Sequence, residues 1–227
     1  IAQGCGEVGI LIKKFHKKVI VIKYGGSILG EEKIRMGVLE DIVFLSFIGI
    51  RTVLVHGGGP NISDRLREEG KKAEFIEGMR VTDEETLIVV EEELKALNEL
   101  IVREISQLGA RAVGLNGKDG KIIQVKKKKG EIDLGLVGEI IGVNTEPILE
   151  VLKTDKIAVV LPMGRGEDKK VYNVNADEAA ASISAALKAE KLVLLTNVKG
   201  VMRNTDDSNS FISTLMVNEA RGLIQHN

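Results

Sequence analysis

Cysteine, tryptophan and long apolar runs are scarce or missing in this chain of 227 residues. Cys5 is the single cysteine, which excludes an internal disulfide and any metal site built from several cysteines. The expected setting is therefore a reducing one, the cytoplasm or, in a eukaryote, an organellar stroma or matrix. No apolar run reaches the roughly 18 residues that a membrane-spanning helix needs, so no membrane partner is expected.

Aromatic side chains are also scarce, and the chain has no excess of positive charge. Aromatic residues make up 3% of the chain and the formal net charge is −1, which gives nucleic acid neither a stacking surface nor a basic one. Hydrophobic residues at 44% and charged residues at 29% are instead ordinary for a globular enzyme. The length allows a large core in one or two domains.

Residues 19–29, VIVIKYGGSIL, contain the feature around which the rest of the chain is organised. Four consecutive β-branched residues at 19–22 predict a strand that is buried on both faces. Lys23, Gly25 and Gly26 follow at its carboxyl end, where open α/β sheets bind ligands. Glycines let backbone N–H groups approach an anion, and a lysine is a point charge suited to phosphate. The alternative is a tight turn with a solvated lysine, and the pattern alone favours neither.

A second glycine turn follows a second buried strand. Residues 52–55 predict that strand, and HGGGP at 56–60 follows it. Pro60 suits the first turn of a helix, so the glycines lie at a helix N-terminus, where free N–H groups and the dipole favour an anion. Three consecutive glycines cost conformational entropy on folding, and a ligand bound by their backbone would account for that cost. This turn is therefore a candidate ligand site. His56 is expected to be a hydrogen-bonded structural residue rather than a base.

The longest expected helix follows Arg80. Thr82 and Glu85 have the spacing of a capping box, and apolar residues recur at helical spacing until Gly109 ends the helix. About 26 residues at 1.5 Å each would span roughly 39 Å. The apolar stripe could face a partner subunit as well as the core. Arg80 is either a surface arginine or a clamp for a carboxylate.

Two more polar clusters lie at the ends of expected elements. Asn175 is expected to cap a helix that has Asp177 in its first turn; capping explains both residues but leaves Asn173 unexplained. The strand at 192–195 also ends in a polar loop, which contains Thr196, Asn197 and Gly200. The remaining expected elements are helices at 31–48, 146–152 and 215–224 and strands at 110–115, 122–125, 139–143 and 157–161.

Seven motifs occur in a fixed order: IKYGG at 22–26, VHGGGP at 55–60, GMRVTDEET at 78–86, VGLNGKDG at 113–120, LVGE at 136–139, NVNADEAA at 173–180 and ALKAEKLVLLTNVKGV at 186–201. Each is weak alone, but the ordered set strongly resembles the acetylglutamate kinases of the amino acid kinase family over nearly all of residues 17–205. GMRVTDEET favours this branch over carbamate kinases, glutamate 5-kinases, aspartokinases and uridylate kinases. The resemblance implies an α/β fold, a three-layer αβα sandwich around a mostly parallel sheet.

The resemblance also implies a reaction. The γ-phosphoryl group of ATP, with Mg²⁺ held mainly by the nucleotide phosphates, would pass to the side-chain carboxylate of N-acetyl-L-glutamate and form N-acetyl-L-glutamyl 5-phosphate in arginine biosynthesis. Lys23 would stabilise the transferring phosphoryl group, and Asp177 would orient that lysine. A carboxylate acceptor is already deprotonated at neutral pH, so no histidine base is required.

The resemblance implies further contacts to each of the two substrates. No side chain is expected to bind a metal ion. Arg80 would bind the α-carboxylate of acetylglutamate, and further contacts to it would come from Gly58, Gly59 and Asn173. Phosphate or nucleotide contacts would come from Gly25, Gly26, Thr196, Asn197 and Gly200. Asn197 departs from the family pattern, which usually has Asp at this position.

Three segments are expected from the resemblance: an N-terminal arm or helix at 1–16, an acetylglutamate-binding lobe at 17–189 and part of an ATP-binding lobe at 190–227. The family has a second phosphoryl-stabilising lysine beyond the last expected helix, so the C-terminal lobe is expected to be truncated. A homodimer is implied, or a hexamer if the arm is what remains of the N-terminal helix of longer members.

Two other functions stay open beside an active acetylglutamate kinase. One is a non-catalytic homologue that binds acetylglutamate but has lost productive use of ATP. The other is a kinase for a related amino-acid carboxylate, such as a carrier-linked aminoadipate.

Overall fold

The computed structural model describes residue 9 and residues 12–25, 31–198, 200–204, 207 and 210–225. The chain divides into two compact units, Ile1–Leu195 and Thr196–Asn227, and each is described by itself. Gly26 lies outside the described residues, as does most of the expected arm at 1–16, of which residues 12–15 are helical. The first unit ends with the strand Lys191–Leu195. The expected lobe boundary after residue 189 would instead assign this strand to the ATP-binding lobe.

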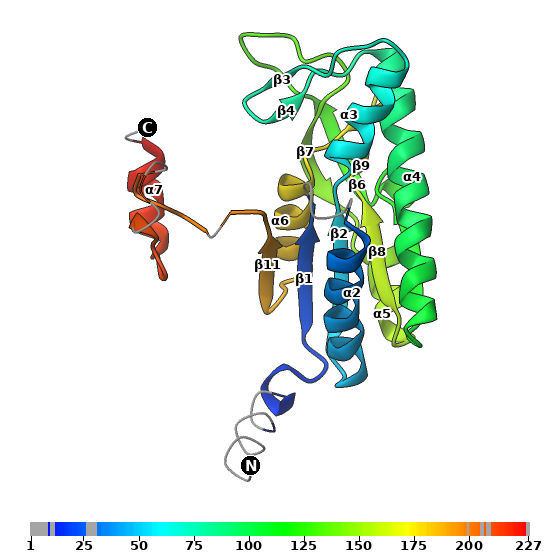
Figure 1. The fold of residues 1–227 in the computed structure, drawn as a ribbon, viewed down its shortest axis with the longest axis vertical. Coiled ribbons are helices and arrows are strands. Elements are labelled where there is room, and N and C mark those ends of the chain that lie inside the picture. Colours follow the sequence, from blue (N-terminus) through cyan, green and yellow to red (C-terminus); the bar gives the residue numbers. More distant parts are fainter. Residues whose placement is uncertain are drawn as a thin grey trace. The chain divides into compact units, whose positions relative to one another are not determined.

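Helices are interleaved with single strands and with short runs of consecutive strands along the first unit (Figure 1). Its helices are α2 (Glu32–Phe47), α3 (Gly59–Glu68), α4 (Glu84–Gln107), the short 3₁₀ helix η2 (Asp119–Lys121), α5 (Glu146–Lys153) and α6 (Ala176–Ala186). Its strands are β1 (Val19–Tyr24), β2 (Arg51–His56), β3 (Phe75–Ile76), β4 (Met79–Arg80), β5 (Ala112–Asn116), β6 (Ile123–Lys127), β7 (Gly138–Val143), β8 (Ile157–Leu161), β9 (Met163–Gly166), β10 (Val171–Asn173) and β11 (Lys191–Leu195). The second unit contains α7 (Val217–Gln225).

Five strands form a parallel sheet in the order β11-β1-β2-β8-β5. The register pairs Tyr24 with His56, so β1 and β2 end at the same level. The glycine turns that follow these strands are therefore neighbours. The N–H of Gly57 joins them by donating to the carbonyl of Tyr24 at 2.9 Å.

Helices cover both faces of this sheet. Ile22 of β1 belongs to a buried cluster with Leu39 of α2 and Ile101 of α4, whereas Val21 belongs to a second cluster with Ile183 of α6. Successive strand residues point to opposite faces, so this division places α2 and α4 on one face and α6 on the other. The predicted α/β sandwich around a mostly parallel sheet is confirmed (Figure 1).

A second sheet of four strands, in the order β10-β9-β6-β7, and a separate β3–β4 hairpin complete the described sheets of this unit. The sequence did not predict β3, β4, β9 or β10. They are short, and β9 (MGRG) and β10 (VYN) have no alternation of apolar and polar residues. Their pairing depends on neighbouring strands rather than on a local pattern.

The predicted capping box at the start of α4 is wrong. Asp83 is the N-cap, and its Oδ1 accepts a hydrogen bond from the N–H of Thr86 at 2.7 Å. The Thr82 hydroxyl is already used, because it donates to the carbonyl of Arg80 at 2.7 Å. The helix has 24 residues. No helix in the described part of the chain is both long enough and apolar enough to cross a membrane.

A buried ion pair ties α2 to α4. Arg35 donates from Nε to Oε2 of Glu104 at 2.8 Å and from Nη2 to Oε1 at 2.7 Å. Both side chains are buried. The hydrogen bonds from Arg35 to Glu104 raise the pKa of the guanidinium, because they stabilise its charged form. The pair fixes the two helices that cover one face of the sheet.

Candidate functional site

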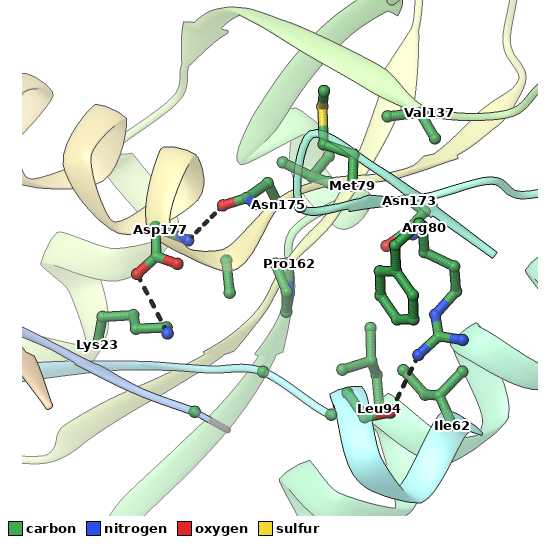
Figure 2. A pocket seen from close by; sticks show the side chains of 18 residues that line it. Lys23, Ile62, Met79, Arg80, Leu94, Val137, Pro162, Asn173, Asn175 and Asp177 are labelled. Atoms are coloured by element: carbon green, nitrogen blue, oxygen red, sulfur yellow. Dashed lines mark hydrogen bonds and ion pairs between the residues drawn. The ribbon is translucent and has the colours of Figure 1, made fainter. Parts of the chain in front are cut away.

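A pocket of about 180 Å³ opens where β1 and β2 end (Figure 2). Its lining comes from both glycine turns, the β3–β4 hairpin, α4, β10 and the start of α6. The carboxyl edge of a parallel sheet is where α/β folds bind ligands, because strand ends and helix N-termini meet there. The pocket therefore occupies the place that the sequence pattern indicated.

Lys23 and Asp177 form an ion pair at one side of the pocket (Figure 2). Lys23 Nζ lies 3.1 Å from Asp177 Oδ1, and the lysine side chain is 12% exposed. Asn175 caps α6 as predicted, since its Oδ1 accepts from the N–H groups of Asp177 at 2.8 Å and Glu178 at 3.1 Å. A Cβ at Gly25 would lie 2.9 Å from Lys23 Nζ, so glycine leaves room for the ammonium group. The pocket thus has a cation held in place by the first turn of α6.

The second glycine turn forms the pocket wall next to this pair. α3 begins at Gly59, with Gly58 as its N-cap and Pro60 in its first turn, as the sequence predicted. Gly57, Gly58 and Gly59 all line the pocket. A helix N-terminus of this kind presents backbone N–H groups and the positive end of the helix dipole to a ligand.

Arg80 lies at the opposite side of the pocket from Lys23 (Figure 2). It is 6% exposed, and its Nη2 donates to the carbonyl of Gly59 at 3.0 Å and to Oγ of Ser63 at 2.9 Å. Its Nη1 is buried without a hydrogen-bond partner, and no carboxylate of the described residues pairs with it. Burial lowers the pKa of this guanidinium. A buried cation with an unsatisfied donor is costly on its own and suits an anionic ligand.

A tight hairpin places Phe75 against this arginine. β3 and β4 pair Phe75 directly with Arg80, and the guanidinium carbon lies 4.6 Å from the centre of the Phe75 ring. The connecting residues Glu77 and Gly78 both have positive φ, of 50° and 75°, the geometry of a two-residue hairpin loop whose twist matches the strands. The stacked ring contributes a cation–π contact that helps to hold the arginine in the pocket wall.

Asn173 reaches the pocket from β10, and its Nδ2 donates to Oγ1 of Thr82 at 3.2 Å. The same threonine hydroxyl donates to the carbonyl of Arg80, so two hydrogen bonds join Asn173 to the strand that carries the arginine. Five apolar residues also line the pocket, and one of them, Pro162, lies between Lys23 and Arg80 in Figure 2: Ile62, Met79, Leu94, Val137 and Pro162. Such a surface suits the carbon skeleton of an organic anion.

The structure brings together seven of the residues singled out in the sequence: Lys23, Gly25, Gly58, Gly59, Arg80, Asn173 and Asp177. Gly26 lies outside the described residues. Thr196, Asn197 and Gly200 belong to the second unit, where the Thr196 hydroxyl donates to the carbonyl of Val198 at 3.0 Å and accepts from its N–H at 3.1 Å.

Sequence reasoning missed two contributors, Ser63 and Phe75. Ser63 lies four residues after Gly59 on α3, and its hydroxyl donates to the Gly59 carbonyl at 2.9 Å, a helical spacing that could have indicated it. Phe75 could have been found from the turn pair at 77–78, because a two-residue hairpin loop would set it opposite Arg80.

Within the described residues, no group of three or more His, Cys, Asp or Glu side chains is arranged to hold a metal ion. The anion-binding groups of the pocket are instead an ammonium, a guanidinium and a helix N-terminus. The site can bind a ligand that carries negative charge at two separated places.

Comparison with known proteins identifies the family of this chain. The chain matches the amino acid kinase family over residues 18–226. It is 46% identical to an acetylglutamate kinase from Caldanaerobacter subterraneus subsp. tengcongensis, in an alignment that covers 94% of this chain and 72% of that protein. It is 44% identical to an acetylglutamate kinase from Thermoanaerobacter pseudethanolicus, covering 92% of this chain and 71% of that protein.

A solved structure of the same fold is N-acetylglutamate synthase from Neisseria gonorrhoeae, complexed with coenzyme A and N-acetyl-glutamate. It is 26% identical to this chain, with a TM-score of 0.84. The comparison covers 100% of this chain and 52% of the synthase chain, so the present chain spans about half the synthase. The family match, the two kinase relatives and this fold lead to one conclusion: the chain belongs to the amino acid kinase family.

Proposed function

We propose that this protein is an acetylglutamate kinase, which transfers the γ-phosphoryl group of ATP to the side-chain carboxylate of N-acetyl-L-glutamate, a step of arginine biosynthesis. The observation that carries the proposal is one pocket with an ammonium group at one side and, at the other, a buried guanidinium whose Nη1 has no partner among the described residues. That arrangement suits a dicarboxylate. The relatives at 44–46% identity that act as acetylglutamate kinases support the same acceptor.

Arg80 would hold the α-carboxylate of acetylglutamate from its side of the pocket. Gly58, Gly59 and Asn173 would contact the rest of the acceptor, whose carbon chain would lie on the apolar residues of the pocket lining. This orientation leaves the side-chain carboxylate near Lys23. Asp177 would keep the ammonium group in place, as its 3.1 Å ion pair supports.

In the transfer step, one oxygen of the side-chain carboxylate forms a bond to the γ-phosphorus. The bond from that phosphorus to the β,γ-bridging oxygen breaks, and its electron pair leaves with ADP. No proton has to move, because the acceptor is already a carboxylate at neutral pH. Lys23 would neutralise charge on the transferring group, with Gly25 and Gly26 against its oxygens; a donor of this kind is worth about 3 kcal/mol in a transition state.

The nucleotide would bring Mg²⁺ with it, and we assign no side chain of this chain to the metal. Mg²⁺ commonly binds through substrate phosphates rather than through a dedicated protein cage. When bound, Mg²⁺ supplies charge neutralisation at the phosphates. Thr196, Asn197 and Gly200 remain our candidates for nucleotide contacts, within an ATP-binding lobe at 190–227 that follows the acetylglutamate-binding lobe at 17–189.

We further infer that the working form is a homodimer in the cytoplasm. Ile88 on the outer side of α4 is 60% exposed, and β5 ends the five-stranded sheet, which supports an interface on this side of the unit. The need for ATP supports an intracellular setting. Light scattering after size-exclusion chromatography distinguishes a dimer from a hexamer and from a monomer.

Trapping of the acyl phosphate with hydroxylamine tests the proposed reaction. The purified protein with ATP, Mg²⁺ and N-acetyl-L-glutamate should give a hydroxamate, and Lys23→Ala should lower the rate by at least about 10²-fold. N-acetyl-L-glutamine is the matched negative control, because its side chain is an amide. Acetylglutamate binding in calorimetry without hydroxamate would instead indicate a non-catalytic homologue. Faster turnover of a carrier-linked aminoadipate would indicate a different acceptor.

A further inference from the structure

His56 ends β2 directly beside the glycine turn, yet it is fully buried and does not line the pocket. Both of its ring nitrogens have hydrogen-bond partners. Nε2 lies 3.0 Å from Nδ2 of Asn98 on α4, and Nδ1 lies 3.2 Å from the carbonyl oxygen of Gly57. The ring therefore connects the longest helix of the unit to the turn that forms the pocket wall.

The backbone carbonyl of Val159 determines which atoms donate and which accept in these hydrogen bonds. Asn98 also faces the carbonyl oxygen of Val159 at 3.0 Å, and a carbonyl can only accept, so the amide group there must be the donor Nδ2. The second hydrogen of the same Nδ2 then points to His56 Nε2, which has to accept it. Burial lowers the pKa of His56 to about 4, so the ring is neutral at pH 7 and has one N–H. That proton is on Nδ1 and is donated to the Gly57 carbonyl.

The Asn98 side chain is itself held firmly. It is 5% exposed, and a Cβ at Gly114 of β5 would collide with its Oδ1, so only glycine at that position leaves space for this amide. β8, which carries Val159, is a central strand whose residues are all buried. The amide orientation is therefore set by the core of the sheet and not by solvent.

The bond to Gly57 fixes the orientation of one peptide group in the turn. The N–H of Gly57 donates to the carbonyl of Tyr24 at 2.9 Å, and the carbonyl of Gly57 accepts from Nδ1 of His56. In a trans peptide the C=O and the following N–H point in opposite directions, so the N–H of Gly58 points away from His56. Within the described part of the chain this N–H has no hydrogen-bond partner, and Gly58 lines the pocket.

We propose that Asn98 and His56 are positioning residues: through the Asn98–His56–Gly57 hydrogen bonds they set the plane of the Gly57–Gly58 peptide and direct the Gly58 N–H at the reacting end of the bound acceptor. This inference rests on the proposed kinase function. It gives His56 a role in turnover without contact to either substrate and without proton transfer. A peptide plane free to rotate would present the Gly58 N–H only part of the time, which lowers the rate of the step more than binding.

Two amide substitutions at position 56 separate the two ring nitrogens. The amide of His56→Asn lies where Nδ1 was and can still donate to the Gly57 carbonyl, whereas the amide of His56→Gln lies where Nε2 was and loses that donation. We expect His56→Asn to lower kcat less than about threefold and His56→Gln to lower it at least about tenfold, with the KM for ATP unchanged in both. If the residue only fills space, the bulkier glutamine replaces histidine better, and the opposite order of kcat would overturn the proposal.

The tautomer of His56 gives a second test that does not depend on activity. In ¹⁵N NMR of the wild-type protein, Nδ1 should show a directly bonded proton at neutral pH and Nε2 should not. Asn98→Leu, which removes the donor to Nε2, should lower kcat in the same direction as His56→Gln. A proton on Nε2 in the wild type would overturn the proposal even if the kinase reaction is confirmed. Failure of the kinase function would instead appear as no hydroxamate from the wild type, with the Nδ1 tautomer unchanged.

Discussion

Two arginines are buried to a similar extent in this protein, Arg35 at 9% and Arg80 at 6% exposure, but they are satisfied in different ways. Arg35 makes a bidentate contact to Glu104, which raises its pKa. Arg80 contacts a carbonyl, a hydroxyl and an aromatic ring, and its pKa is lowered by burial. Its Nη1 has no hydrogen-bond partner in the part of the chain that the structure describes. Burial alone therefore does not distinguish a structural arginine from a ligand-binding one. The distinction lies in whether the protein supplies the counter-charge itself.

The largest expected effect is on stability, at the arginine that is already paired. Arg35→Met leaves Glu104 as a buried charge without its partner and should lower the free energy of unfolding by about 3–5 kcal/mol. Urea denaturation followed by circular dichroism measures this loss. The KM for acetylglutamate should stay unchanged, because Arg35 does not line the pocket.

The double variant Arg35→Met/Glu104→Met is the matched control for this prediction. It removes both charges, so it should recover most of the lost stability. A double variant as unstable as Arg35→Met alone would show that the single substitution acts through packing, and the contrast between the two arginines would lose its basis.

The next largest effect is on activity, at the unpaired arginine. Arg80→Met should lower kcat/KM for acetylglutamate by about 10²–10³-fold, mainly through KM, because a charged partner of the ligand is lost away from the reacting atoms. Its unfolding free energy should stay the same or rise, since a buried unpaired cation is removed. Steady-state kinetics and urea denaturation measure both quantities. Arg67→Met is the control for charge, because Arg67 is exposed and pairs with Asp64 on the surface. Equal losses in the two variants would contradict the assignment.

His56 shows a third way to bury a basic group, which is to keep it neutral. Its folded pKa of about 4 lies below the model-peptide value of 6.5, so the unfolded state takes up the proton first as the pH falls. The unfolding free energy should therefore decrease between pH 6.5 and pH 4, by up to about 3 kcal/mol. His56→Gln should flatten this part of the stability–pH curve. Hydrogen bonds from Thr86 lower the pKa of Asp83 to about 2, so that group titrates below this range. The same slope in wild type and His56→Gln would show that other groups cause it.

The smallest expected effect concerns the pair of Lys23 and Asp177, which is only half enclosed because the aspartate side chain is 53% exposed. Asp177→Asn keeps the shape and removes the charge. We expect kcat to fall by about tenfold or less, since an ion pair open to solvent is worth about 1 kcal/mol or less. Added salt should lower kcat of the wild type more than that of the variant. A loss as large as that of Lys23→Ala would mean that Asp177 does more than orient the lysine.

Local patterns predicted most of the central sheet and one side of the site. The β-branched run before Lys23 and the glycines before Pro60 are signals within a few residues, and the parallel order of the strands brings them together. The cap at Asn175 is equally local. These features depend on residues that are close together in the sequence, so the sequence was sufficient to predict them.

The rest depends on contacts between distant residues. Asn98 and His56 are 42 positions apart, and nothing near either one indicates the hydrogen bond between them. The local pattern left open whether Arg80 is on the surface, and only the family resemblance assigned it to a carboxylate. Its burial depends on the hairpin that sets Phe75 across from it. Thr82 was misassigned as a cap for the same reason, since its hydroxyl is used by Asn173 and by the Arg80 carbonyl.

Calorimetry of two ligands on two proteins tests the central claim, that the ligand supplies the counter-charge that Arg80 does not find among the described residues. The ligands are N-acetyl-L-glutamate and its α-amide, and the proteins are the wild type and Arg80→Met. The wild type should bind the α-amide about 10²-fold more weakly than the acid, whereas Arg80→Met should bind the two ligands about equally. The same discrimination by both proteins would contradict the claim, because the α-carboxylate would then be recognised elsewhere.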